Sequence, residues 1–203
     1  GNEEDNVLDG AGGKNTVSYS GAAAGVTVDL GITAAQNTGD GNDTLLNFSN
    51  LTGSSQDDIL KGNDNSNIIK GGNGADTIYG IGGSNFLYGE AGNDTFIGKV
   101  AGSDFIDGGA GSNKVDYSSL TQANSITVNL GTTTTFNDEN SVSQTVYQIG
   151  INGGDSDYVK NISVFEGSAG NDIFTVTNGT YEFIGGSGDD TFNGTNFTGV
   201  VIN

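Results

Sequence analysis

Residues 53–97 read as five consecutive nonapeptides: GSSQDDILK (53–61), GNDNSNIIK (62–70), GGNGADTIY (71–79), GIGGSNFLY (80–88) and GEAGNDTFI (89–97). A ten-residue unit, GKVAGSDFID (98–107), and one further nonapeptide, GGAGSNKVD (108–116), continue the series. Every unit begins with glycine, and in the nine-residue units the sixth residue is Asp or Asn and the eighth is apolar. Self-similarity at a fixed period is typical of a solenoid, in which each unit adds one layer.

Each nonapeptide has two physically different halves. The first six residues are mostly Gly, Asn, Ser and Asp, which suit turns with positive φ and close backbone approach. The last three place one apolar residue between variable ones, which predicts a strand of about three residues whose middle side chain points inward. Two units then complete a circuit of 18 residues, and stacked circuits give an all-β fold, a right-handed parallel β-roll or β-solenoid. The expected core residues are Leu60, Ile69, Ile78, Leu87, Phe96, Ile106 and Val115.

The period of 18 residues aligns side chains along the edges of the roll. One edge carries Asp58, Asp76 and Asp94. The opposite edge carries asparagines, Asn67 and Asn85, before Asp104. The same spacing separates two later aspartates, and a spacing of 15 residues precedes each group, from Asp43 to Asp58 and from Asp157 to Asp172 and Asp190.

Stacked carboxylates require a counter-charge. Neighbouring coils of a parallel sheet are about 4.8 Å apart, and two carboxylates at that distance repel by about 1 kcal/mol in water and about 3 kcal/mol at an effective dielectric constant near 20. A divalent cation between the turns reverses that repulsion. Carboxylates and backbone carbonyl groups are hard oxygen ligands, which favour Ca²⁺ over softer metals, and Mg²⁺ suits the site less because it prefers octahedral geometry and retained water.

The units resemble the G-G-x-G-x-D-x-U-x repeat of the RTX, or hemolysin-type, calcium-binding proteins. GGNGADTIY (71–79) and GGSGDDTFN (185–193) match that pattern in the glycines, the aspartate and the apolar position. The uninterrupted tract covers residues 53–116, about a third of the chain. Four turns depart from the pattern at the second glycine position, where they hold Ser54, Asn63, Ile81 and Glu90.

The resemblance implies that each calcium ion lies between one turn and the turn a full circuit later. The ligands that it implies here are paired carboxylates, Asp58 with Asp76, Asp76 with Asp94, and Asp172 with Asp190. The implied carbonyl ligands are those of Gly71, Gly72, Asn73, Gly74, Gly89 and Gly92. Asp43, Asp104 and Asp157 are further candidates. Because Asn67, Asn85 and Asn113 replace the carboxylate, we expect weak calcium binding along the asparagine edge, or asparagine amide ladders in its place.

A longer repeat divides the chain into two modules. NVLDGAGGKNTVSYS (6–20) aligns with DFIDGGAGSNKVDYS (104–118), and DTLLNFSNLTGSSQDDIL (43–60) aligns with DYVKNISVFEGSAGNDIF (157–174). We therefore expect a first module over residues 1–103, whose repeat tract runs on to about residue 118, and a second over residues 104–203. The insertions at 31–42 and 131–156 are predicted to form loops or extra strands on one side.

Composition excludes several classes of protein. Six basic and 25 acidic residues give a net charge of −19, which repels phosphate backbones and anionic lipid and so argues against nucleic-acid partners. The chain has no Cys and no His, so thiol chemistry and imidazole catalysis are absent. No apolar run approaches 18 residues, which argues against membrane insertion. The first residues lack the pattern of a signal peptide, and we expect the chain to be part of a larger protein.

The leading functional interpretation is a non-enzymatic module that binds several calcium ions. The RTX resemblance implies a bacterial protein that leaves the cell by type I secretion and folds outside on calcium. We expect a structural part of a surface-layer protein or an adhesin at the cell surface, with neighbouring domains of its parent chain, or further copies of itself, as partners. The alternative is an appendage or part of a secreted carbohydrate-active enzyme. The contiguous threonine run 132–135 is a poor match for an ice-binding array.

Overall fold

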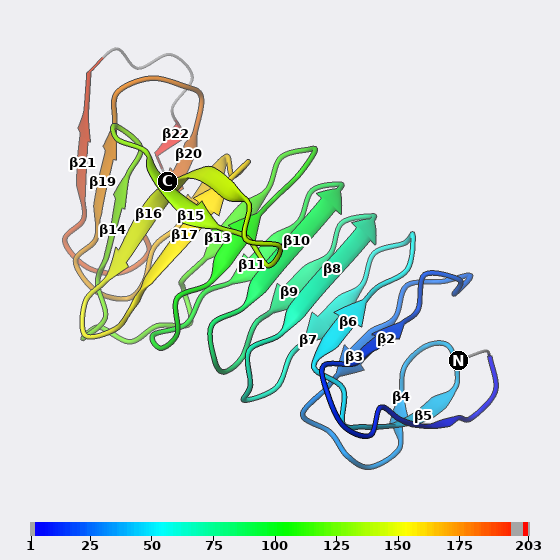
Figure 1. The fold of residues 1–203 in the computed structure, drawn as a ribbon. Helices are drawn as coiled ribbons and strands as arrows, with labels where there is room; N and C mark the ends of the chain where they lie inside the picture. Colours follow the sequence, from blue (N-terminus) through cyan, green and yellow to red (C-terminus); the bar gives the residue numbers. More distant parts are fainter. Residues whose placement is uncertain (1–2, 196–200, 203) are drawn as a thin grey trace.

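The computed structural model describes residues 3–195 and 201–202. Its strands form two long sheets that face each other across a thin core, and the chain passes from one sheet to the other at almost every turn. Figure 1 shows the coils stacked from the N-terminal end of the roll to the C-terminal end. The described residues form no helix, so none of them could cross a membrane as one. The all-β prediction and the parallel roll are confirmed.

The larger sheet contains mainly the strands that follow the asparagine edge. Its order is β2 (Thr16–Ser18), β6 (Asn50–Thr52), β8 (Ile68–Asn73), β10 (Phe86–Ala91), β12 (Phe105–Asp107), β17 (Ser156–Lys160), β16 (Ser143–Ile151), β14 (Ile126–Asn129), β19 (Ile173–Val176) and β21 (Thr191–Gly194), with β15 (Thr134–Asn137) paired to β16. Every pairing in this sheet is parallel except those of β16 with its three neighbours.

The second sheet is parallel throughout. Its order is β22 (Val201–Ile202), β20 (Glu182–Ile184), β18 (Val164–Glu166), β13 (Lys114–Asp116), β11 (Thr95–Ile97), β9 (Thr77–Tyr79), β7 (Ile59–Lys61) and β3 (Thr27–Asp29). A third, small sheet at the N-terminal end has the order β1 (Val7–Asp9), β5 (Asn42–Leu46) and β4 (Gln36–Asn37). Both long sheets continue without a break across residues 103 and 104.

The core consists of two facing columns of apolar side chains in register. Each strand contributes its middle residue, so that Leu60 pairs with Ile78, and Ile78 with Phe96. The opposite sheet aligns Ile69 with Leu87 in the same way. All seven core residues expected from the sequence are at most 2% exposed. Burial of each such side chain contributes about 1.5–3 kcal/mol, and the regular period therefore fixes the register along the roll.

Two strands are longer than the repeat predicts. β8 and β10 each contain six residues rather than three, because pairing continues from Glu90 to Gly72 and from Ala91 to Asn73. The ten-residue unit does not disturb its strand, since Leu87 still pairs with Ile106. Its extra residue is therefore accommodated in the turn between Gly98 and Asp104.

Strand pairing follows the longer repeat. β1 pairs with β5 as β12 pairs with β17, and β2 pairs with β6 as β13 pairs with β18. β3 likewise pairs with β7 as β14 pairs with β19. The insertions supply extra strands: β4 pairs antiparallel with β5, and β16 lies antiparallel between β17 and β14. The longer insertion is thus partly built into the larger sheet.

Candidate metal centre

Three columns of Asp and Asn side chains lie along the edges of the roll. We define the first column as Asp58, Asp76, Asp94 and Asn113, the second as Asn67, Asn85, Asp104 and Asp157, and the third as Asp172 and Asp190. In each column, a side-chain oxygen accepts a hydrogen bond from the backbone N–H of the preceding member, at 2.8–3.0 Å. Nearly all members are buried, and only Asp190 is half-buried.

These columns arise directly from the repeat. The sixth residue of each unit ends a turn and precedes a strand, so its side chain points along the roll toward the coil before it. Asn113 continues the column of Asp58 rather than the asparagine edge. The expected asparagine amide ladder is also different in detail, because Asn85 Oδ1 accepts the main-chain N–H of Asn67 rather than its amide group.

The first column contains two carboxylate oxygens with no hydrogen-bond partner. They are Oδ2 of Asp76 and Oδ2 of Asp94, the two buried side-chain polar atoms in this state among the described residues. Both aspartates are 1% exposed. A buried carboxylate oxygen without a partner loses its hydration with no compensation, so these two atoms are where the fold lacks a positive charge or a donor.

Glycine leaves room beside these two oxygens. A Cβ at Gly71 would overlap Asp76 Oδ2 and would lie 2.9 Å from the carbonyl oxygen of Gly89. A Cβ at Gly89 would overlap Asp94 Oδ2 and would lie 2.7 Å from the carbonyl oxygen of Gly108. Each cradle therefore brings one carboxylate oxygen and one carbonyl oxygen from the next coil to the same place, and both are hard ligands that suit Ca²⁺.

The remaining predicted carbonyl ligands lie around these cradles. Gly71, Gly72 and Asn73 belong to β8 rather than to a free turn, and Gly89 belongs to β10. Gly74 and Gly92 follow these strands, and Gly74 N–H donates to the Ala91 carbonyl at 2.9 Å. The φ angles of 121° at Gly72 and 114° at Gly74 exclude most other residues.

Burial perturbs the acidity of the first column. Desolvation raises the pKa of Asp76 to about 7, and repulsion from Asp58, Asp94 and Asp57 adds to that effect against the hydrogen bond from Asp58 N–H. Desolvation also raises the pKa of Asp94. Without a cation, the folded chain therefore favours the protonated form of these carboxyl groups.

Asp58 and Asp172 differ from Asp76 because a serine completes each of them. Ser54 donates from its backbone N–H to Asp58 Oδ2 at 2.6 Å and from its hydroxyl to Oδ1 at 2.8 Å. Ser168 makes the equivalent bonds to Asp172, at 2.7 and 2.9 Å. Both serines stand four residues before the aspartate, where the repeat has its second glycine, so the signal was visible in the sequence.

Asp43 and Asp157 are completed by tyrosines. Tyr19 donates its hydroxyl to Asp43 Oδ2 at 2.8 Å, and Tyr117 donates to Asp157 Oδ2 at 2.6 Å. Both tyrosines are at most 2% exposed, and burial together with the adjacent carboxylate raises the pKa of each. Sequence analysis missed these pairs, although the alignment of the two modules places the tyrosines at equivalent positions.

Asp104 is completed by a lysine. Lys99 Nζ lies 2.7 Å from Asp104 Oδ2. Burial raises the pKa of Asp104 despite this ion pair, and burial with repulsion from Asp104 raises the pKa of Asp157 to about 7. Of the predicted ligands, Asp76 and Asp94 therefore have open oxygens, whereas the chain itself supplies partners to Asp43, Asp58, Asp104, Asp157 and Asp172.

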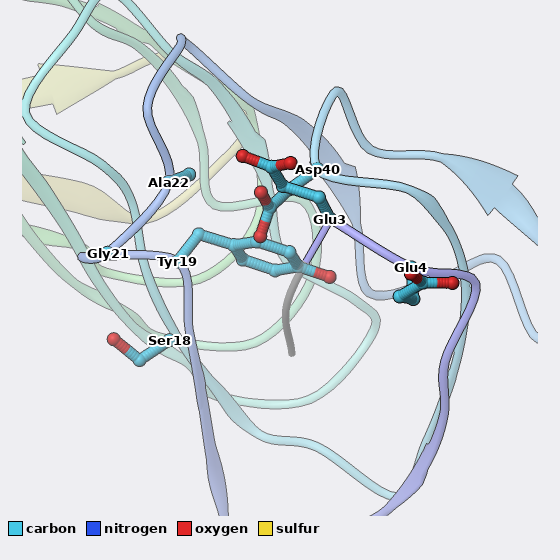
Figure 2. A pocket seen from close by; sticks show the side chains of 7 residues that line it. All are labelled: Glu3, Glu4, Ser18, Tyr19, Gly21, Ala22 and Asp40. Carbon is cyan, nitrogen blue, oxygen red and sulfur yellow. The ribbon is translucent and has the colours of Figure 1, made fainter.

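A cavity of about 440 Å³ lies at the N-terminal end of the roll, beside the pair of Tyr19 and Asp43. Figure 2 shows the carboxyl groups of Glu3 and Asp40 gathered next to the Tyr19 ring. The cavity is remote in sequence from the cradles at Gly71 and Gly89. Within the described part of the chain, no three acidic side chains converge to hold a metal by themselves, so a cation at any column needs main-chain carbonyl ligands.

The comparisons agree with the geometry. The family described as the RTX calcium-binding nonapeptide repeat (four copies) matches residues 52–85, 71–99 and 101–119. These segments contain the first column and both glycine cradles. A search of the curated proteins gave no significant match.

Proposed function

We propose that this chain, which carries RTX calcium-binding nonapeptide repeats over residues 52–99 and 101–119, is a non-catalytic structural module that completes its fold on binding calcium ions. The observation that carries the proposal is the pair of buried, unpartnered oxygens of Asp76 and Asp94. Their residues fit calcium, because each oxygen shares a glycine-lined cradle with a carbonyl oxygen of the next coil.

The aspartates couple binding to folding. Asp76 uses Oδ1 to accept the N–H of Asp58, and its own N–H donates to Asp94 Oδ1. Each side chain therefore links two coils and at the same time leaves Oδ2 facing the cradle. Bound calcium would supply the positive charge that these carboxylates lack. Because the cradle exists only when successive coils are stacked, binding free energy would become folding free energy.

The proposal extends to the place where the module works. RTX repeat proteins are typically secreted, and the absence of Cys together with a charge of −19 is compatible with secretion. An extracellular medium containing millimolar calcium would fill sites with dissociation constants of about 10⁻⁴–10⁻³ M. We therefore place the chain in a secreted or cell-surface protein, such as a surface-layer protein or an adhesin, with neighbouring domains or further copies as its contacts.

A calcium titration tests this function directly. Far-UV circular dichroism and thermal unfolding are measured in EGTA, in Mg²⁺ and in Ca²⁺, and calorimetry gives the number of bound ions. We expect calcium, but not magnesium at the same concentration, to increase β-structure and the midpoint of unfolding. Each site would contribute about 2.7 kcal/mol at a free concentration of 100 times its dissociation constant. Identical spectra and midpoints in EGTA and in calcium would refute the proposal.

A further inference from the structure

Lys99 holds its ammonium group inside the edge of the roll. Its Nζ lies 2.7 Å from both carboxylate oxygens of Asp104, and the two side chains are 16% and 3% exposed. The ion pairs of Lys114 and Lys160 are more open, with 27% of each lysine side chain exposed. Ion pairs that are withdrawn from solvent are screened much less by salt, so Lys99 is a fixed positive charge at this position.

The surroundings of Lys99 repeat the arrangement of the first column. Asp104 donates its N–H to Asp157 Oδ1 at 2.9 Å, as Asp76 donates to Asp94 Oδ1 at 2.9 Å. Glycine is again adjacent, since a Cβ at Gly80 would lie 3.0 Å from Asp104 Oδ2. The backbone relation between the two carboxylates is thus the same in both columns.

The two columns differ in what completes the carboxylates. Oδ2 of Asp76 and Oδ2 of Asp94 have no partner, whereas Oδ2 of Asp104 contacts Lys99 Nζ and Oδ2 of Asp157 accepts the hydroxyl of Tyr117. The second column therefore has its own cation at the position where the first column is open.

We propose that Lys99 is a built-in cation, which performs for Asp104 and Asp157 the charge neutralisation assigned to calcium at Asp76 and Asp94, and that its removal opens a divalent-cation site at this pair. The inference rests on the proposed calcium binding and deepens it. It means that this coil closes without an ion, although two of the chain's buried carboxylates meet there.

The residue at the second position of each turn explains how the chain selects among these states. Ser54 completes Asp58 with an N–H and a hydroxyl group, and Gly72 supplies no side chain to Asp76. Lys99 stands at the second position of the ten-residue unit, and the extra residue of that turn separates it from Asp104 by five positions instead of four. A serine thus provides neutral donors, a lysine provides a charge, and a glycine leaves the carboxylate open to an ion.

Substitution of Lys99 tests the inference. K99M keeps the length of the side chain and removes its charge, and K99R keeps the charge. K61M is the matched control, because Lys61 lies over the ring of Tyr79 at 5.1 Å rather than at a column. Calcium bound per chain is measured by equilibrium dialysis with excess calcium, and folding is monitored by far-UV circular dichroism.

We expect K99M to bind one more calcium ion per chain than the wild type, whereas K99R and K61M bind the wild-type number. The double variant K99M/D104N should return to the wild-type number, because it removes the carboxylate that the ion would contact. Terbium, excited through tyrosine, provides a second readout. Its emission should increase in K99M because Tyr117 adjoins the new site, and K99M/Y117F should lose that increase.

Two results would overturn the inference. One is a folded K99M chain that binds the same number of ions as the wild type. The other is a K99M chain that stays unfolded in about 10 mM calcium, well above the affinities expected of extracellular sites, while K99M/D104N folds. Failure of the proposed function is seen separately, because it would appear as a wild-type chain that binds no calcium, whatever the difference between K99M and the wild type.

Discussion

Asp76 combines three properties that the other predicted ligands share only in part. It is buried, it links the coils before and after it through hydrogen bonds, and one of its oxygens has no partner. Asp58 has the first two properties but receives the serine hydroxyl of Ser54. The sequence period identifies every member of the column, whereas only side-chain contacts separate an open carboxylate from a completed one.

The substitution D76N should affect the two states of the chain in opposite directions. It preserves Oδ1 as the acceptor for Asp58 N–H but removes a buried negative charge, so the calcium-free fold should become more stable. The same change removes a calcium ligand, so the stabilisation gained on adding calcium should decrease by about 2–3 kcal/mol, the contribution of one saturated site. Thermal unfolding in EGTA and in calcium measures both effects.

D64N is the control for this prediction, because Asp64 is an exposed turn residue within the same repeat tract. It removes one charge of the same sign and should leave the calcium response unchanged. If D76N and D64N respond to calcium equally, Asp76 is a structural turn residue and the assignment of the first column as a metal centre fails.

At the scale of elements, the longer insertion covers one face of the roll. Phe136 on β15 stacks on Tyr158 of β17 at a centroid distance of 4.4 Å and on Phe105 of β12 at 5.8 Å. Glu139, beyond the end of β15, accepts a hydrogen bond from Tyr88 on β10. In Figure 1 this connection extends from β15 across neighbouring strands of the larger sheet. Aromatic residues on the outer face of these strands thus form a docking surface for the chain's own insertion.

F136A should loosen the insertion without unfolding the roll. Each aromatic pair contributes about 0.5–1.5 kcal/mol beyond its buried area, and the pairs of Phe136 attach β15 to strands that are held independently by the ladder. Amide hydrogen exchange should therefore become faster in residues 134–146, while the core strands β9 and β11 keep their protection.

V142A in the same connection is the comparison for F136A, since Val142 is 53% exposed. It should leave exchange in β15 unchanged. Loss of protection throughout β9 and β11 in F136A would show that the insertion and the roll unfold as one unit.

At the scale of the molecule, the fold has few independent ways to offset its acidity. The chain has a net charge of −19, and burial raises the pKa values of Asp76 and Asp157 to about 7 and also raises those of Asp94 and Asp172. Solenoid coils contact only their neighbours, so a charge left uncompensated in one coil destabilises the stacking on both sides of it.

This leads to a prediction for pH. The folded chain binds more protons than the unfolded chain wherever a carboxyl pKa is raised, so without calcium the stability should be greatest in mild acid and should fall as pH increases from about 4 to about 7. Each fully displaced group contributes a slope on the order of 1 kcal/mol per pH unit. Asp9, Asp116 and Asp138, whose pKa values are lowered, act in the opposite direction only in the more acidic range.

Thermal midpoints measured across this range in EGTA and in calcium check the prediction. Saturating calcium should flatten or reverse the slope, because calcium competes with protons for the same oxygens. A midpoint in EGTA that rises steadily from pH 4 to pH 7 would contradict the claim that these buried carboxylates are uncompensated.

Much of this protein is determined by its sequence alone, because a period of nine residues leaves few choices. Glycine and Asn turns alternate with one apolar residue per strand, and this pattern sets the parallel roll, the register and the seven core residues of the central coils. It also aligns the aspartates in columns, since side chains one circuit apart must lie one above the other. The alignment of the two modules likewise predicts that their strands pair in the same way.

Only the tertiary structure decided which carboxylates remain open. Lys99, Ser54 and Tyr117 reach their aspartates through the particular path of each turn, and the period carries no information about those paths. The place of β16 inside the larger sheet was equally beyond the sequence, because an antiparallel strand can join only where two neighbouring strands leave their edges unpaired. The repeat therefore specifies the scaffold, and contacts between coils specify its charge balance.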